Sequence, residues 1–267
     1  MDRLAQRERI EKEALVFWKS FVDEIIYHNR YHPCHPLIDF LRDYLREHIS
    51  IIEAETILYR ARIIDYMGPG GESTGFVKFM NHEKCGVYEG YDEKNSFVPP
   101  ANVTGSGRAN PERIVYLYAA KEIITAIGET RPRIFDHISV AKIQILRDLR
   151  LADFTVVDES EELSLEAAKL MEIEQAFSQT CRDPIDYIPT QYIAEYVKTL
   201  GYDGIAFRSS YVPGGTNITI FDPEVAKAIA SAPYKMDSIT YRARRIFPLK
   251  DLDAFEIIAT NKPPDIE

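Results

Sequence analysis

The chain has 267 residues, of which 45% are hydrophobic and 28% are charged, a composition typical of a globular protein that buries a substantial core. Its 32 Lys and Arg residues against 42 Asp and Glu residues give a formal net charge of -10, which opposes nonspecific binding to nucleic acid. An anionic substrate therefore needs a local cluster of Arg or Lys.

The N-terminal residues have no apolar core of the signal-peptide type, and no run approaches the roughly 18 apolar residues of a membrane span. The three cysteines, Cys34, Cys85 and Cys181, are odd in number and widely scattered. This pattern favours reduced thiols over a disulfide framework. We therefore expect a cytoplasmic protein.

The first 50 residues carry two amphipathic patterns. Apolar residues fall on one side of a helical period over residues 15–26 and again over residues 37–49. Pro33 and Pro36 lie between the two patterns and make a continuous helix improbable. We predict a helical N-terminal extension over residues 1–50 and a main domain over residues 51–267.

Four residues of metal-binding types gather between these helices. They are His28, His32, Cys34 and His35. Their spacing matches no common zinc pattern, and the two prolines among them favour a turn between helices. A turn is the preferred interpretation, and no metal site is predicted.

Strands and short helices are expected to alternate in the middle of the chain. Leu58–Ile63 has the composition of a strand, whereas Asp65–Pro111 has weak periodicity and many Gly, Pro and Asn residues. A strand at Ile114–Tyr118, a helix at Lys121–Gly128 and further strands between Ile134 and Val157 follow.

Two helices and two strands are expected in the next part of the chain. The helices are at residues 164–180 and 190–200, and the strands are at residues 204–209 and 217–221. Ser164 is a suitable N-cap, Gly201 a suitable left-handed C-cap, and Pro213-Gly214-Gly215 a turn between the strands. Strands and helices mix without βαβ regularity, which indicates the α+β class.

Three segments have a specific appearance. They are Leu58-Tyr59-Arg60-Ala61-Arg62, then Gly105-Ser106-Gly107-Arg108-Ala109-Asn110-Pro111 with Gly128-Glu129-Thr130-Arg131-Pro132 downstream, and Gly201-Tyr202-Asp203-Gly204 followed by Arg208-Ser209-Ser210 and Asn217. In order and spacing, over roughly residues 50 to 230, they closely resemble the RES domain, a family of bacterial proteins often encoded as toxins beside a helix-turn-helix antitoxin. The resemblance implies an ADP-ribosyltransferase-like fold with a split mixed sheet, and it makes residues 51–267 the RES catalytic domain.

The resemblance also implies a set of site residues. Arg60, Glu129 and Ser209 match the Arg, Glu and Ser of the family name and are the predicted catalytic residues. The predicted substrate-binding residues are Arg108, Tyr118, Tyr59, Arg62 and Ser210. Ser209 and Ser210 remain alternatives to each other, because a slip of one residue on a strand sends the side chain to the opposite face.

The family binds NAD and either degrades it or transfers ADP-ribose, and these residue types suit that chemistry. Cleavage of the nicotinamide bond builds positive charge on the ribose, which a carboxylate such as Glu129 stabilises. Arg60 and Arg108 supply paired N–H donors for the diphosphate, and Tyr118 offers an aromatic face to the cationic nicotinamide ring. Ser209 is expected to hydrogen-bond the ribose or the carboxamide.

The resemblance thus implies an NAD glycohydrolase or phosphorylase that acts as a toxin or defence effector by depleting NAD. NAD is the substrate, and no further cofactor is expected. Transfer of ADP-ribose to a protein and a non-catalytic module that senses NAD remain alternatives. The expected partner is a basic helix-turn-helix antitoxin, with no membrane and no direct nucleic-acid contact. For the apolar stripes of the N-terminal helices, a place in the core, self-association with a second copy of the chain and coupling to another defence component remain alternatives.

Overall fold

The computed structural model describes residues 3–64, 77–79, 86–88, 91–155, 163–181, 183–244 and 256–261. The predicted loop from Asp65 to Pro111 therefore lies partly outside the described residues. The α-helices are α1 (Arg3–Asp23), α2 (Leu37–Glu47), α3 (Glu93–Ser96), α4 (Ile123–Glu129), α5 (Leu165–Ser178) and α6 (Ile188–Thr199). A π-helical turn at Glu24–His28 extends α1, and short 3-10 turns lie at Ala101–Val103, Pro184–Tyr187 and Pro223–Val225.

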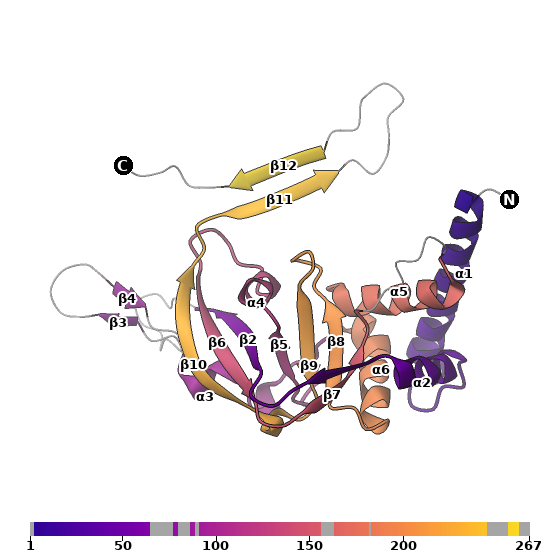
Figure 1. Cartoon of the computed structure of the whole chain (residues 1–267), viewed down its shortest axis with the longest axis horizontal. Coiled ribbons are helices and arrows are strands. Elements are labelled where there is room, and N and C mark those ends of the chain that lie inside the picture. The colour runs from indigo at the N-terminus through magenta and orange to yellow at the C-terminus, as the bar shows by residue number, and fades with distance from the viewer. Residues whose placement is uncertain are drawn as a thin grey trace.

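Most of the strands form one mixed sheet (Figure 1). The strands are β1 (Ile49–Ile52), β2 (Ile57–Ile63), β3 (Val77–Phe79), β4 (Gly86–Tyr88), β5 (Leu117–Ala120), β6 (His137–Ile145), β7 (Leu149–Asp153), β8 (Gly204–Arg208), β9 (Thr216–Ile220), β10 (Ala226–Lys235), β11 (Ile239–Arg244) and β12 (Glu256–Asn261). The eight-stranded sheet has the order β1-β7-β8-β9-β5-β2-β6-β10, and β3-β4 and β11-β12 form separate pairs.

The sheet opens between β2 and β5. β2 pairs with β6 along its whole length, and β5 pairs with β9 along its whole length. Between β2 and β5, however, Tyr59 and Ala120 are the single pair in register. Only β7 and β8 run parallel among neighbouring strands of this sheet. The predicted α+β class and split mixed sheet are confirmed.

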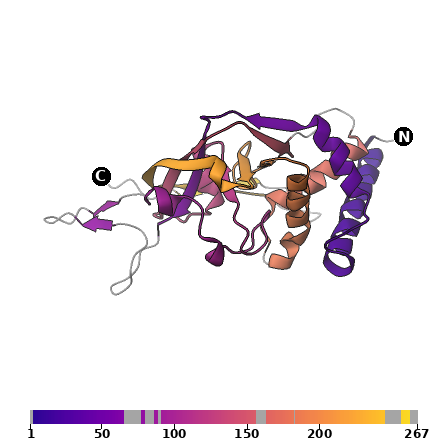
Figure 2. The ribbon, with the colours of Figure 1, turned by 90° about the horizontal axis from the view of Figure 1, so that it is seen from below.

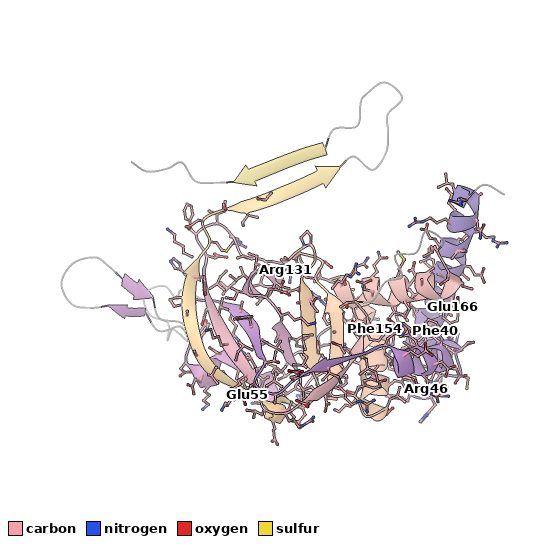
Figure 3. The ribbon with its side chains drawn as sticks, viewed as in Figure 1. Phe40, Arg46, Glu55, Arg131, Phe154 and Glu166 are labelled. Atoms are coloured by element: carbon pink, nitrogen blue, oxygen red, sulfur yellow. The ribbon has the colours of Figure 1, made fainter. Side chains whose placement is uncertain are left out.

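The N-terminal helices pack against the rest of the protein rather than standing apart from it. Leu37, Leu41 and Leu45 of α2 are fully buried in one cluster with Phe177 of α5 and Ile193 of α6. Figure 2 shows α1, α2, α5 and α6 gathered at one end of the sheet, and Figure 3 labels Phe154 of this cluster there, together with Phe40, which packs against it. The helical N-terminal part is confirmed, and it shares a hydrophobic core with the sheet.

The period of two along the strands decides which side chains face the helices. On β8, Ile205 and Phe207 belong to the helix-facing cluster, while Ala206 belongs to the cluster on the other face. On β5 and β9 the apolar neighbours of Tyr118 and Asn217 lie in that second cluster. Tyr118 and Asn217 therefore share the helix-facing side with Phe207.

Several local predictions are confirmed by backbone geometry. The Ser164 side chain accepts a hydrogen bond from the Ala167 amide and so caps α5. Gly201, with φ of 82°, and Gly214, with φ of 76°, adopt the left-handed conformation at the predicted cap and turn. The turn expected between the first two helices is also present, where Asn29 Oδ1 accepts a hydrogen bond from the His32 amide.

Other boundaries differ from the sequence prediction. β5 begins at Leu117 rather than at Ile114, because Asn110 Nδ2 donates to the carbonyls of Pro111 and Ile114 and holds that segment as a loop. β1 and β10, at the two edges of the sheet, were not predicted. In the part of the chain that the structure describes, no helix has the length and apolar character needed to cross a membrane.

Candidate active site

A cavity of about 330 Å³ lies at the opening between β2 and β5. Of the eight predicted site residues, five line it: Tyr59, Arg60, Arg108, Tyr118 and Glu129. They come from β2, β5, the loop before β5 and the end of α4. Ser209, Arg62 and Ser210 are described but do not line this cavity.

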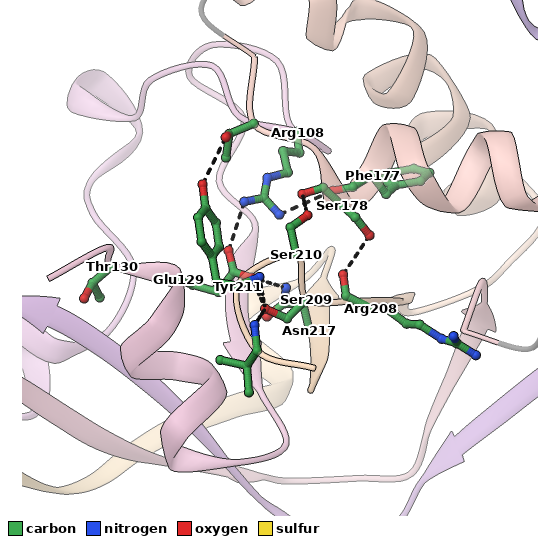
Figure 4. Close-up of polar contacts among 12 residues, drawn as sticks. Arg108, Glu129, Thr130, Phe177, Ser178, Arg208, Ser209, Ser210, Tyr211 and Asn217 are labelled. Carbon is green, nitrogen blue, oxygen red and sulfur yellow. Dashed lines mark hydrogen bonds and ion pairs between the residues drawn. The ribbon is translucent and has the colours of Figure 1, made fainter. Parts of the chain in front are cut away.

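Glu129 is the last residue of α4, and three donors hold its carboxylate (Figure 4). Arg108 Nη2 lies 2.9 Å from Oε2, while Ser209 Oγ and Asn217 Nδ2 donate to Oε1 at 2.8 and 2.6 Å. The ion pair is largely shielded, since the side chains of Arg108 and Glu129 are 13% and 21% exposed. These contacts from three separate segments fix the orientation of the carboxylate at the cavity wall.

The two adjacent serines have different partners. Ser209 follows β8 directly, and its Oγ donates to Glu129 and accepts from the amides of Tyr211 and Val212 at 3.1 and 3.2 Å. Ser210 Oγ instead donates to the carbonyl of Ser178 at the end of α5. Ser209 is therefore the serine that contacts the predicted catalytic carboxylate.

Arg60 is a buried cation with no anionic partner among the described residues. Its Nη1 donates to the Tyr118 carbonyl at 3.0 Å across the opening of the sheet, and its buried Nε has no partner among the described residues. Burial, followed by repulsion from Arg62, lowers the pKa of Arg60 to about 10, against a smaller opposing effect of Tyr118. Arg62 Nη2 donates to the Phe97 carbonyl at 2.6 Å, away from the cavity lining.

The Tyr118 hydroxyl is built into the loop over residues 105–111. It donates to Asn110 Oδ1 at 2.7 Å and accepts from the Ala109 amide at 3.0 Å. Burial raises the pKa of Tyr118 to about 12, so the phenol is neutral near pH 7. A Cβ atom at Gly107 would overlap Asn110 Oδ1 and lie 2.9 Å from the Tyr118 oxygen, which explains why this position is glycine.

The start of α6 fastens the same loop from the other side. Thr190 Oγ1 donates to the Arg108 carbonyl at 2.6 Å, and Gln191 Nε2 donates to the Gly107 carbonyl and to Ser106 Oγ, both at 2.8 Å. The loop backbone is thus held while the Arg108 side chain reaches Glu129. This anchoring gives the ion pair a rigid support.

Four residues that hydrogen-bond the predicted site residues or their loop were not themselves predicted. Asn110 and Asn217 lie inside the segments that resemble the RES domain, and their place in those segments was the available signal. Thr190 and Gln191 carry no local signal, because they meet the loop more than 80 residues upstream only in the folded chain.

Comparison with known proteins extends these observations. No curated protein matches the chain. Among solved structures, it is similar to a chain of the crystal structure of the M. tuberculosis MbcT-MbcA toxin-antitoxin complex, with 12% identity, a TM-score of 0.42, and coverage of 74% of this chain and 91% of that chain. The family model of the RES domain matches residues 88–242, a segment that contains Arg108, Glu129 and Ser209 but begins after Arg60. Because this match spans more than half of the 267 residues, the chain belongs to the RES domain family.

Proposed function

We propose that this protein cleaves the bond between nicotinamide and ribose in NAD. One juxtaposition carries the proposal: the oriented carboxylate of Glu129 and the unpaired buried guanidinium of Arg60 line the same cavity. The first suits a developing cation and the second suits an anionic group. NAD carries both groups: a ribose on which positive charge develops and an anionic diphosphate.

The chemistry assigns a task to Glu129. As the glycosidic bond breaks, its electron pair passes to the ring nitrogen of nicotinamide, which leaves as a neutral molecule. Positive charge then develops on the ribose, and a fixed carboxylate stabilises this state more than the ground state. Water or phosphate completes the reaction by adding to the ribose carbon, and Glu129 is the nearby acceptor for the proton that water loses.

The two arginines have different roles in this proposal. An uncompensated buried cation is unfavourable, and a diphosphate group in the cavity would supply the opposite charge that Arg60 lacks among the described residues. Arg108 already holds Glu129 and the Phe177 carbonyl, which occupies two of its five N–H donors. It therefore positions the carboxylate first and contacts the substrate with its remaining donors.

The aromatic lining suits the leaving group. Tyr59 and Tyr118 line the cavity together with Tyr187 and Phe207. A cationic nicotinamide ring over such a face gains roughly 0.5–2 kcal/mol. Because the Tyr118 hydroxyl is committed to Asn110 and Ala109, the ring of Tyr118 rather than its hydroxyl is the group available to substrate.

The biological consequence that we propose is toxicity by depletion of cytoplasmic NAD, controlled by a helix-turn-helix antitoxin. The net charge of -10 favours a basic partner. The N-terminal apolar stripes proposed for self-association are already covered within the chain, since Phe21, Leu37, Leu41 and Leu45 are fully buried. A partner would therefore use another surface.

The test is incubation of the purified protein with NAD, followed by separation of the products. Free ADP-ribose indicates hydrolysis, its phosphate ester indicates phosphorolysis, and labelled protein indicates ADP-ribosyl transfer. We expect one of the first two. Binding of NAD without any product would identify a sensing module and contradict the proposal.

The variant Glu129→Gln sharpens this test. It keeps the size of the side chain but removes the charge proposed to stabilise the transition state, so turnover should fall by roughly 10²–10³-fold or more while NAD affinity changes little. Glu112→Gln is the matched control, because Glu112 is 72% exposed and pairs with Arg113 outside the cavity. Near-normal turnover of Glu129→Gln would show that Glu129 is not catalytic.

A further inference from the structure

Asn217 occupies an unusual position for an asparagine. It is the second residue of β9, only 6% exposed, and pairs with Ala120 of β5 and Phe207 of β8, which also line the cavity. Asparagine is disfavoured in strands, and a buried amide is costly unless its polar atoms are bonded. Strand stability therefore does not account for Asn217.

The orientation of its amide follows from its neighbour. Asn217 Nδ2 lies 2.6 Å from Glu129 Oε1 (Figure 4). An ionised carboxylate only accepts hydrogen bonds, so the atom that faces it must be the NH₂ group. The carbonyl oxygen Oδ1 consequently points away from Glu129.

Oδ1 is an acceptor that no described residue uses. The hydrogen bond to Glu129 is the one side-chain bond that Asn217 makes in the described part of the chain. Asn217 Oδ1 is not sealed inside the protein, and Asn217 lines the cavity. A buried residue thus presents a free carbonyl oxygen to the space where a substrate would bind.

We propose that Asn217 Oδ1 accepts a hydrogen bond from the ribose hydroxyl next to the carbon that reacts. This inference rests on the proposed function. Because Nδ2 of the same amide holds Glu129, a donor that reaches Oδ1 lies beside the group that the carboxylate stabilises. The amide then joins carboxylate and sugar, and Asn217 selects substrates that carry the 2′-hydroxyl on the nicotinamide side.

The test combines variants with substrate analogues. The values of kcat/KM are measured for NAD, for NAD without the 2′-hydroxyl of the nicotinamide ribose, and for the 3-acetylpyridine analogue, which lacks the carboxamide N–H. Asn217→Leu removes both amide contacts, so it lowers kcat/KM for every substrate. We expect its loss to be about tenfold larger for NAD and the acetylpyridine analogue than for the 2′-deoxy analogue, since only the latter already lacks the bond.

Each other result overturns the inference. An equal loss for all three substrates would show that Asn217 acts only through Glu129, and a smaller loss for the acetylpyridine analogue would assign Oδ1 to the carboxamide. A protein that neither binds nor cleaves NAD would overturn the proposed function as well, whereas one that cleaves NAD without this selectivity overturns the inference alone.

Two further variants keep the experiment decisive. Asn217→Ser, whose side chain is too short to reach the substrate, repeats the cycle if the leucine variant fails to fold. Thr219→Val is the matched control: Thr219 is buried two residues along the same strand face, its Oγ1 has no partner among the described residues, and it does not line the cavity. We expect less than a twofold change in kcat/KM for all three substrates with Thr219→Val.

Discussion

Two arginines in the same cavity have opposite electrostatic situations. Arg108 is paired with Glu129, and the pair is further bonded to Ser209, Asn217 and the Phe177 carbonyl. Within the described part of the chain, Arg60 has one neutral acceptor, and its buried Nε has none. Removing a paired charge leaves its partner uncompensated, whereas removing an unpaired buried charge removes its desolvation penalty. If Arg60 binds the substrate as proposed, it is the residue at which substrate binding and stability oppose each other.

Arg60→Met should leave the free energy of unfolding of the ligand-free protein unchanged or raise it, while NAD affinity falls at least tenfold. Burial lowers the pKa of Arg60 to about 10, which means that the folded state disfavours the charged guanidinium. The resulting loss of folding free energy is present at pH 7 and declines as the pH rises through about 10. Denaturant unfolding at pH 7 and calorimetric titration with NAD measure the two effects.

Arg46→Met provides the control for this prediction. Arg46 is 72% exposed on α2 and pairs with Asp43, so both quantities should stay within experimental error. A loss of more than about 2 kcal/mol on Arg60→Met would instead identify Arg60 as a structural residue, since the lost bond to the Tyr118 carbonyl is worth about 1 kcal/mol.

At the scale of elements, the loop over residues 105–111 depends on close backbone approach. Asn110 and Tyr118 leave no space for a side chain at Gly107, while a Cβ atom at Gly105 would have no neighbour within 4 Å. Gly107→Ala should therefore cost about 1–3 kcal/mol of folding free energy and weaken NAD cleavage, because the loop must move and Arg108 moves with it.

Gly105→Ala is the matched substitution in the same loop. It should leave stability and turnover unchanged, or raise stability by roughly 0.4–1 kcal/mol by restricting the unfolded chain. Thermal unfolding and NAD turnover of both variants are compared side by side. Equal behaviour of the two variants would show that the packing around Gly107 is unimportant.

The segment between α6 and β8 is fixed by a carboxylate. Asp203 accepts from Arg147 Nη2 at 2.6 Å and from the Arg150 amide at 2.8 Å, and so ties the start of β8 to β7. Burial alone would raise the pKa of Asp203, but these hydrogen bonds and the charges of Arg147 and Arg150 lower it overall. A depressed pKa means that the ionised form stabilises the fold above the unfolded pKa of about 3.9.

Asp203→Asn should therefore cost about 1 kcal/mol at pH 7, a modest value because Arg147 is 52% exposed and solvent screens the pair. The difference from the wild-type protein should shrink as the pH falls below about 4, where the aspartate loses its charge in the wild-type protein too. Denaturant unfolding from pH 7 to pH 3 follows this change. A difference that is constant with pH would assign the effect to geometry rather than charge.

At the scale of the whole molecule, the N-terminal helices complete the core. Leu41 is fully buried among residues of α1, α5 and α6, whereas Val16 on α1 is 60% exposed. Leu41→Ala should cost about 2–5 kcal/mol, and Val16→Ala less than about 0.5 kcal/mol. Both are measured by denaturant unfolding, and a single transition is expected because helices and sheet share that core.

The same experiment decides whether residues 1–50 are separable. A small loss on Leu41→Ala, or a second transition in the wild-type protein, would mean that the helices unfold independently of the sheet. A full loss in one transition would mean that a chain starting near Ile51 exposes Phe177 and Ile193 and does not fold.

The sequence by itself determined the elements whose signals are local. Residues spaced along one helical period predicted α2 and the C-terminal part of α1, while Ser164, Gly201 and Gly214 marked the start of α5, the end of α6 and the turn between β8 and β9 through their own backbone preferences. The family segments also placed Glu129, Arg60 and Arg108 in one group, and the folded chain brings all three to one cavity.

Only the tertiary structure decided how these residues are used. Glu129 meets Ser209 and Asn217 across 80 and 88 residues of chain, and Arg60 reaches the Tyr118 carbonyl only because β2 and β5 separate. Local periodicity contains no information on such pairings, because they depend on strand order and on which face each residue occupies. The contact of Ser209 with Glu129 and the free acceptor of Asn217 follow from that order.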